Sequence, residues 1–209
     1  MRLVLASNNA KKLGELATLF APLGLDLVAQ SAFGIAEADE PHPTFIENAL
    51  AKARHAALHA GAAAIADDSG LCVAALGGAP GVVSAHYAEV DVDLVDREAR
   101  RRVQDEANNR LLLERMAGLE DRRARFVSTL VAVRSAVDPE PLVCVGRWDG
   151  TLLDAPHGAG GFGYDPLLCI PGLGKTVAAL DPIEKNAHSH RAIAARLMLA
   201  SMREAWGLG

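Results

Sequence analysis

The chain has 209 residues, 50% of them hydrophobic, and a formal net charge of -5 at pH 7. This length and apolar content are enough to bury a sizeable core, and we expect one domain over residues 1–209. The acidic residues are dispersed, which argues against the broad basic surface of a polynucleotide-binding protein. No run of about 18 apolar residues could cross a membrane, and the chain begins with a strand pattern rather than a signal peptide. We therefore expect a cytoplasmic protein with neither a polynucleotide nor a membrane partner.

The N-terminal half alternates short apolar strands with amphipathic helices. Hydrophobic spacing predicts three strands, over residues 2–7, 25–29 and 62–66, and a first helix over residues 11–23. Thr44 and Glu47 have the spacing of a capping box, in which each side chain satisfies a backbone donor at the start of a helix. We therefore expect a second helix that begins directly after Thr44.

The C-terminal half continues this alternation and completes an α/β pattern. Further strands are predicted over residues 71–76, 125–134 and 142–147, the last two as an antiparallel pair, and helices over residues 93–116 and 182–205. The charge of the helix over residues 93–116 is interpreted as a solvated face. Asp181 and Pro182 are the residue types preferred at the N-cap and first position of a helix, so they mark the start of the last one.

The most informative segment is Asp67-Asp68-Ser69-Gly70, two acids, a hydroxyl and a glycine after an apolar strand. Carboxylates at a strand end are costly to desolvate unless a cation joins them, and a divalent metal is the usual candidate. Asp, Ser and Gly are also ordinary turn residues, so a simple turn is an open alternative. Because neighbouring strand residues point to opposite faces, only one of the two acids is expected to face a site.

Glu40 and Lys52 could complete a charged site around this segment. Glu40 lies in the loop before the second helix, and Lys52 lies within that helix. Mg²⁺ prefers a small number of carboxylates together with waters and substrate phosphates, so two acids from separate segments would suffice. An exposed lysine on a helix surface is the alternative interpretation of Lys52, and the sequence alone favours it.

Three further segments could contact a nucleotide. Ser7-Asn8-Asn9-Ala10-Lys11-Lys12 lies between the first strand and helix, where polar side chains and free backbone N–H groups could surround phosphate oxygens; a helix cap with solvated lysines is the alternative. Phe162 and Tyr164, in a glycine-rich stretch, could stack on a base or be buried in a hairpin. Lys185 and Ser189-His190-Arg191 offer donors to carbonyl oxygens of a ligand, or are ordinary surface residues.

The joint occurrence of these segments in this order identifies a family. The chain closely resembles the noncanonical purine nucleoside triphosphate pyrophosphatases, the inosine/xanthosine triphosphate pyrophosphatase family. The matching segments span almost the whole chain and are SNNAKK, TFIENALAKA, ADDSGL, GGAPGVVSAHY, GGFGYDPL and SHR. The resemblance implies an elongated, two-lobed α/β fold, with a mixed sheet flanked by helices and the active cleft between the lobes.

The resemblance also implies an activity and a set of site residues. The expected reaction is hydrolysis of ITP, dITP or XTP to the nucleoside monophosphate and pyrophosphate, with Mg²⁺ as cofactor, typically by a homodimer. Asp68 would be the catalytic acid-base residue and a metal ligand, Glu40 would be the second metal ligand, and Asp67 would support them. The triphosphate would be held by Ser7, Asn8, Asn9, Ala10, Lys11, Lys12 and Lys52. The remaining substrate contacts would come from Ser69, Phe162, Gly163, Tyr164, Asp165, Lys185, His190 and Arg191, the last three largely around the base.

Two competing functions are left open by the residues. One is pyrophosphohydrolysis of another modified nucleotide, and the other is a nucleotide-binding regulator without turnover. The presence of Glu40, Asp68, Lys12 and Lys52 together argues against the regulator, because a passive binder does not need a full metal and phosphate set. The helix over residues 93–116 and its following loop are longer than in compact family members. They are remote in sequence from the catalytic motifs, so we expect no effect on the reaction.

Overall fold

The computed structural model describes residues 2–91 and 96–208, and the chain divides into two compact units. Unit 1 comprises Met1–Ser69, Ser128–Arg147 and His188–Gly209, and unit 2 comprises Gly70–Val127 and Trp148–Ala187. The five helices of the described chain are α1 (Ala10–Phe20), α2 (Phe45–Ala60), α3 (Arg97–Met116), α4 (Pro182–His188) and α5 (His190–Trp206).

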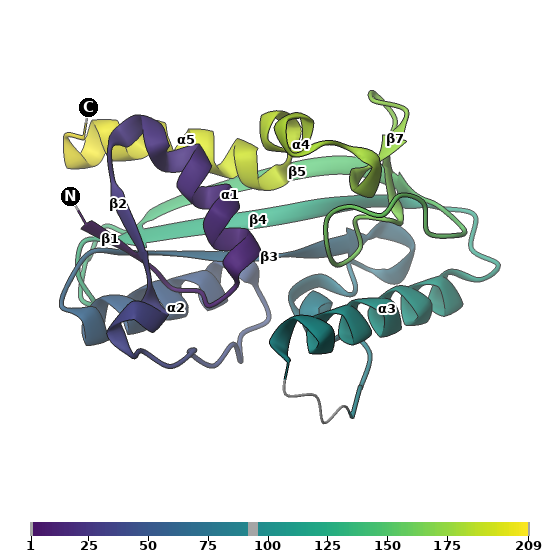
Figure 1. The fold of residues 1–209 in the computed structure, drawn as a ribbon, viewed down its shortest axis with the longest axis horizontal. Coiled ribbons are helices and arrows are strands. Elements are labelled where there is room, and N and C mark those ends of the chain that lie inside the picture. Colours follow the sequence, from purple (N-terminus) through teal and green to yellow (C-terminus); the bar gives the residue numbers. More distant parts are fainter. Residues whose placement is uncertain (1, 92–95, 209) are drawn as a thin grey trace. The chain divides into compact units, whose positions relative to one another are not determined.

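Seven strands of the described residues form one mixed sheet in the order β2-β1-β3-β4-β5-β6-β7 (Figure 1). They are β1 (Arg2–Leu5), β2 (Asp26–Ala29), β3 (Ala64–Val73), β4 (Arg123–Val133), β5 (Leu142–Leu152), β6 (Leu168–Ile170) and β7 (Lys175–Thr176). β1 pairs in parallel with β2 and β3, whereas β6 pairs antiparallel with β5 and β7. The prediction of a mixed sheet flanked by helices is confirmed.

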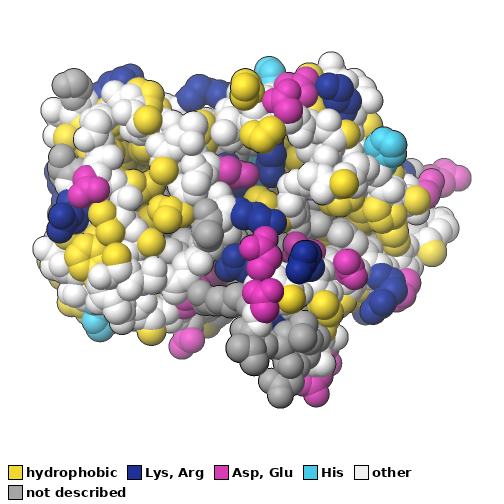
Figure 2. All heavy atoms as spheres, in the orientation of Figure 1, with side chains coloured by type: hydrophobic (Ala, Val, Ile, Leu, Met, Phe, Trp, Pro, Cys, Tyr) yellow, Lys and Arg dark blue, Asp and Glu magenta, His cyan; other side chains and the backbone are white. Residues whose placement is uncertain are grey.

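The surface on the face drawn in Figure 2 is of mixed charge, with Lys and Arg side chains interspersed among Asp and Glu side chains. Across residues 2–91 and 96–208, none of the helices has the length and apolar character that crossing a membrane requires.

In unit 1, the two-residue period of the strands sends alternate side chains to helices on opposite faces of the sheet. Ile65 and Leu130 pack with residues of α1 and α5. Their strand neighbours Ala66 and Val131 pack with a row of buried alanines on α2. Thr44 caps α2 as predicted, since its Oγ1 accepts a hydrogen bond from the Glu47 N–H. The same alternation decides where the acids of β3 point.

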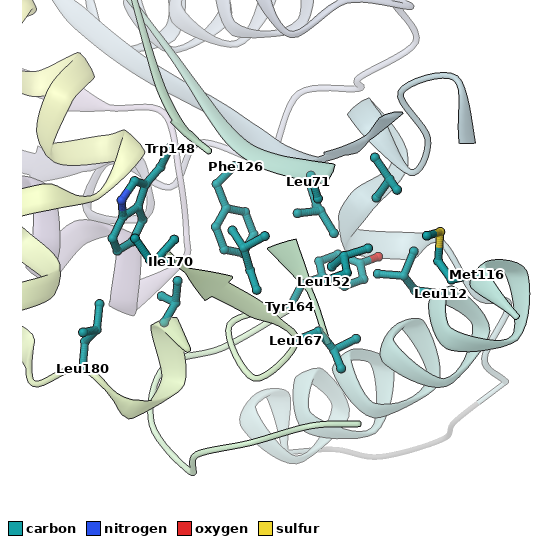
Figure 3. Close-up of a cluster of buried hydrophobic side chains, with 14 residues drawn as sticks. Leu71, Leu112, Met116, Phe126, Trp148, Leu152, Tyr164, Leu167, Ile170 and Leu180 are labelled. Atoms are coloured by element: carbon teal, nitrogen blue, oxygen red, sulfur yellow. The ribbon is translucent and has the colours of Figure 1, made fainter. Parts of the chain in front are cut away.

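Unit 2 has its own hydrophobic core, to which α3 contributes Leu112 and Met116 (Figure 3). These side chains pack in one cluster with Leu71, Phe126 and the ring of Tyr164. Leu71 and Leu112 are fully buried, so the apolar side of α3 is covered by the rest of this unit. α3 therefore packs its apolar side against the hydrophobic core of unit 2.

The acidic segment lies inside a strand and not in a turn. β3 is continuous from Ala64 to Val73, where the sequence predicts one strand ending at residue 66 and another beginning at residue 71. The turn interpretation is therefore wrong. Gly70 has no room for a side chain, because a Cβ there would lie 2.4 Å from Gly81 O and 2.4 Å from Ser84 Oγ. The glycine is needed for this close approach rather than for a turn.

The last predicted helix is two helices. Asp181 caps α4 as predicted, because its Oδ1 accepts hydrogen bonds from the N–H groups of Ile183 and Glu184. Ser189 has an extended backbone and its Oγ accepts from the Ala192 N–H, so it caps a new helix, α5. This second cap is the physical reason for the break, and it places His190 and Arg191 in the first turn of α5.

Smaller corrections concern the ends of other elements. The first helix ends at Phe20 and not at residue 23, because Pro22 lies in a short 3₁₀ turn that follows it. The first strand ends at Leu5, and β5 continues to Leu152, five residues beyond its predicted end at residue 147. α3 begins at Arg97, and the predicted start at residue 93 lies outside the described residues.

Candidate active site

Asp67 and Asp68 point to opposite faces of β3. Ile65 and Asp67 share the face that is covered by α1 and α5, whereas Ala66 and Asp68 share the face that is covered by α2. Each acid therefore has its own set of partners, as predicted for neighbouring residues of a strand.

Asp67 is fully surrounded by donors and cations. Its Oδ2 lies 2.9 Å from Lys12 Nζ and 3.2 Å from Arg191 Nη2, and it accepts a hydrogen bond from Ser69 Oγ at 3.1 Å. Ser128 Oγ donates to the other oxygen at 2.7 Å. Burial opposes ionisation of Asp67, but the charges of Lys12 and Arg191 and these hydrogen bonds hold its pKa well below the usual range. Asp67 is thus an ionised, compensated carboxylate.

Asp68 has one oxygen bound and one oxygen open. Lys52 Nζ lies 2.9 Å from Asp68 Oδ1 and also contacts Glu40 Oε2 at 3.1 Å, while Asp68 Oδ2 is buried without a hydrogen-bond partner in the described chain. Burial raises the pKa of Asp68 to about 6; the Lys52 charge opposes this shift, and Glu40 adds to it. Lys52 itself is buried, so its interpretation as an exposed lysine is wrong. Despite burial, the two carboxylates raise the pKa of Lys52, which keeps it charged.

The residues around Asp68 fit a divalent cation. Its unpartnered Oδ2 and the Glu40 carboxylate are hard oxygen ligands of the kind that Mg²⁺ takes. The described residues contain no cluster of three or more His, Cys, Asp or Glu side chains that could hold a metal by themselves. Two carboxylates suit Mg²⁺, which keeps several waters and shares substrate phosphates, better than an ion held by protein ligands alone.

The segment before α1 combines a helix cap with a lysine that is turned inward. Asn9 Oδ1 accepts hydrogen bonds from the N–H groups of Lys11 and Lys12, at 3.0 and 3.3 Å, and Ser7 Oγ accepts from the Asn9 N–H. The expectation that the backbone donors here are free is therefore wrong for these three groups. Lys12 reaches Asp67 rather than solvent, Lys11 is exposed, and Asn8 Oδ1 is buried without a partner within the described residues. Ala10 is the first residue of α1.

Arg191 is buried and reaches from α5 to both α1 and β3. Its Nη2 donates to Ser69 Oγ at 3.1 Å as well as to Asp67, and its Nη1 pairs with Glu15 of α1. The structure thus places the guanidinium beside Asp67, and its expected contact with a base stays a prediction. His190 is also buried. Gly146 of β5 lets the start of α5 approach the sheet, because a Cβ there would lie 1.9 Å from His190 O.

In unit 2, the predicted base-binding residues form a second cluster. Asp165 Oδ2 accepts hydrogen bonds from Lys185 Nζ at 2.8 Å and from the Phe162 N–H at 2.9 Å. Lys185 Nζ also lies 4.5 Å from the centroid of the Phe162 ring, in a cation–π contact. Tyr164 is buried in the core and its hydroxyl donates to Ser84 O, so stacking on a base is wrong for Tyr164 and stays a prediction for Phe162.

Sequence reasoning missed two partners of the unit 1 site, Glu15 and Ser128. Glu15 lies one helical turn after Lys12, a spacing that puts both on the same side of α1. Ser128 is a polar residue in the mostly apolar second half of β4, where it is followed by Thr129, and this is a recognisable signal because buried hydroxyls need a partner. Neither signal identifies the partner, since Asp67 is 61 residues away from Ser128 in the chain.

The sequence and the fold both resemble those of known proteins. The sequence model of the Ham1 family matches residues 3–201, nearly the whole chain. The chain belongs to the Ham1 family. A Ham1 protein of known structure from Coxiella burnetii superposes with a TM-score of 0.87 at 39% identity, covering 98% of this chain and 99% of that one. Among Ham1 relatives, a protein from Methylibium petroleiphilum named dITP/XTP pyrophosphatase is 68% identical over 99% of both chains. One of the same name from Leptothrix cholodnii is 67% identical over the full length of both.

Proposed function

We propose that this Ham1 protein hydrolyses dITP, ITP and XTP between the α and β phosphates, releasing the monophosphate and pyrophosphate and removing these nucleotides from the pool. The names of its relatives, at up to 68% identity over nearly the full chain, support this activity. The observation that carries the proposal is the Asp68 carboxylate, buried beside Lys52 and Glu40 with one oxygen unpartnered. Such a group is suited to a metal and a water, and it is poorly suited to a purely structural role.

Glu40 and Asp68 would hold Mg²⁺, which when bound supplies charge neutralisation to the phosphates. The ammonium of Lys52 contacts both of these carboxylates and would stabilise the negative charge that develops on the leaving pyrophosphate. We assign the further triphosphate contacts to the segment before α1, namely Ser7, Asn8, Asn9, Ala10, Lys11 and Lys12.

Asp68 is proposed to orient the attacking water and to accept its proton. Without metal, burial gives Asp68 a pKa of about 6, so the carboxylate is ionised near neutral pH and can accept a hydrogen bond from the attacking water. Positioning of this water in line with the leaving group, together with charge neutralisation, accounts for most of the rate enhancement in phosphoryl chemistry. Asp67 would act indirectly, by holding Lys12 and Arg191 in place.

The remaining substrate contacts are assigned to Ser69, Phe162, Gly163, Asp165, Lys185, His190 and Arg191, the last three largely around the base. Phe162 offers an aromatic face, and the cationic donors suit the 6-oxo group of hypoxanthine and xanthine. Adenine carries an amine at that position and would leave such donors unpaired, a mismatch that can discriminate by a factor on the order of 10⁴. Tyr164 would support this segment from within the core.

The test is a pyrophosphate-release assay on dITP, ITP and XTP, with and without Mg²⁺, beside ATP, GTP and a set of methylated and pyrimidine triphosphates. We expect Mg²⁺-dependent release of one pyrophosphate per nucleotide, with the highest kcat/KM on the 6-oxo purines that lack an amino group. Faster turnover of another modified nucleotide would reassign the substrate class. Tight binding of ITP without turnover in Mg²⁺ would instead indicate the nucleotide-binding regulator.

The assembly and the location are proposals that rest on the family resemblance. We propose a homodimer that acts in the cytoplasm, where nucleotide pools are exposed to deamination. Neither feature enters the assignment of the residues above.

A further inference from the structure

The inner side of α3 is polar where it meets the loops of unit 2. Its exposed side carries charged residues, and charged side chains lie among uncharged atoms in this part of Figure 2. Gln104, Asp105, Asn108 and Asn109 face the other way and are half-buried or buried. Their amide and carboxylate groups bind backbone atoms of two other segments, so α3 does more than present a solvated face.

Asp105 and Asn109 form hydrogen bonds with the backbone N–H and C=O groups of the same residue, Gly163. Asp105 Oδ2 accepts a hydrogen bond from the Gly163 N–H at 2.8 Å, and Asn109 Nδ2 donates to Gly163 O at 3.0 Å. Because the two residues are four apart on a helix, their side chains project from the same face one turn apart. The amide orientation of Asn109 is determined by this contact, since only its NH₂ group can donate to a carbonyl oxygen.

A second contact fixes the residue after Gly163. Tyr164 donates its hydroxyl to Ser84 O at 2.9 Å, and Asn108 Nδ2 donates to the same carbonyl at 3.2 Å. Burial raises the pKa of Tyr164, with the nearby Tyr87 and Asp105 adding to the effect, so the phenol stays protonated and remains a donor. α3 therefore ties the segment that contains Ser84 to the segment that contains Gly163.

Gly163, whose N–H and C=O groups are held by Asp105 and Asn109, directly follows Phe162. Gly163 has a φ of +60°, a conformation that leaves the chain direction sensitive to how its flanking peptides are held. Phe162 in turn contacts Lys185 through its ring and Asp165 through its N–H. Holding the Gly163 N–H and C=O thus determines where the Phe162 ring and the cation beside it lie.

We propose that Asp105 and Asn109 are positioning residues for base binding, acting through Gly163 on Phe162 and Lys185; this inference rests on the proposed function. Their effect is on affinity for the nucleoside part of the substrate. Asp105 and Asn109 hold Gly163 through hydrogen bonds. The effect of replacing either residue should therefore depend on whether the new side chain can donate or accept, and not on its volume.

The test compares Asn109→Asp, which keeps the shape but places an acceptor against Gly163 O, with Asp105→Asn, whose amide oxygen can still accept from the Gly163 N–H. Steady-state kinetics on ITP and product inhibition by IMP and by pyrophosphate are measured for each. For Asn109→Asp we expect the KM for ITP and the inhibition constant of IMP to rise about tenfold. A factor of this size corresponds to the cost of leaving one buried hydrogen-bonding group unpaired. The kcat and the inhibition constant of pyrophosphate should change by less than about twofold.

Asp105→Asn should stay close to the parent protein, and Asp105→Ala should behave like Asn109→Asp. Glu106→Ala, which removes an exposed acid from the neighbouring position of α3, is the matched control and should change nothing. If Asn109→Asp is folded, by its melting curve, and binds IMP as the parent does, the inference is wrong. Equal weakening of IMP and pyrophosphate would also overturn it, because that result indicates a general structural loss. Lack of ITP turnover in the parent protein would overturn the proposed function instead.

Discussion

The neighbouring carboxylates Asp67 and Asp68 lie on opposite faces of β3, and their pKa values are shifted in opposite directions. On the face toward α1 and α5, Asp67 meets two cations and two hydroxyls, and its pKa is held well below the usual range. On the face toward α2, Asp68 shares a single lysine with Glu40, keeps one oxygen unpartnered, and has its pKa raised to about 6. The sequence neighbours differ because the strand pleat gives each one the partners of a different helix.

This difference shows how one dipeptide can serve both structure and chemistry. Asp67 is the internal counter-ion of Lys12 and Arg191, so removing its charge would leave Lys12 without this carboxylate and Arg191 with the Glu15 carboxylate in its place. Asp68 is left undersatisfied, and undersatisfied buried acids are typical of sites that must accept a proton or a metal. Three measurements test this contrast between Asp67 and Asp68, and they follow from the largest expected effect to the smallest.

Asp68→Asn should lower kcat for ITP by about 10²–10⁴-fold, because the amide can neither accept a proton nor replace a carboxylate ligand. The variant keeps the size of the side chain and should fold normally, as judged by its melting curve. Titration of activity with Mg²⁺ provides a second readout, since the variant should need a higher concentration. A folded Asp68→Asn protein with near-normal kcat would contradict the catalytic assignment.

Asp67→Asn should lower the free energy of unfolding by about 3–5 kcal/mol, the cost of leaving one side of a buried ion pair uncompensated. The measurement is urea denaturation in the absence of metal, with Asp68→Asn as the matched comparison on the other face. Loss of activity in Asp67→Asn should follow the loss of folded protein and be partly restored at low temperature. Equal stability of the two variants would show that the two faces do not differ as described.

The parts of the site that were predictable are those encoded by adjacent residues. The acid pair is read directly from adjacent residues, and the Thr44 cap of α2 and the Asp181 cap of α4 are local because each binds backbone donors within four residues. The opposite orientation of Asp67 and Asp68 also follows from local geometry, since it requires only that both lie in a strand. The six matching sequence segments added the assignment of roles.

The parts that were not predictable depend on partners far apart in the chain. Lys52 resembles any surface lysine until α2 is packed on β3, and Arg191 resembles a surface residue until Ser189 breaks the helix before it. Asp105 and Asn109 have the composition of a solvated helix face, and only their contacts with Gly163 distinguish them. Polar residues of this kind give no hydrophobic periodicity, so the sequence does not say which of them face inward.

The smallest effect concerns the pH dependence of stability without metal. The pKa of Asp68 is raised on folding, from an ordinary value of 3.8 to about 6, so the folded protein binds more protons than the unfolded one between these values. Its contribution to stability is therefore fully present below about pH 4 and is lost as the pH rises through about 6. Asp67 has the opposite sign: its pKa is lowered, so its contribution is present above about pH 4 and is lost on acidification. Unfolding by urea in EDTA at about pH 4 and about pH 8 should show Asp68→Asn gaining about 1–3 kcal/mol relative to the parent as the pH is raised from the lower to the higher value. Addition of Mg²⁺ at about pH 8 should stabilise the parent more than Asp68→Asn at the same concentration, because the cation then replaces the missing proton at Asp68. If the parent and Asp68→Asn have the same pH dependence, Asp68 is compensated as fully as Asp67 and the contrast between the two faces of β3 is wrong.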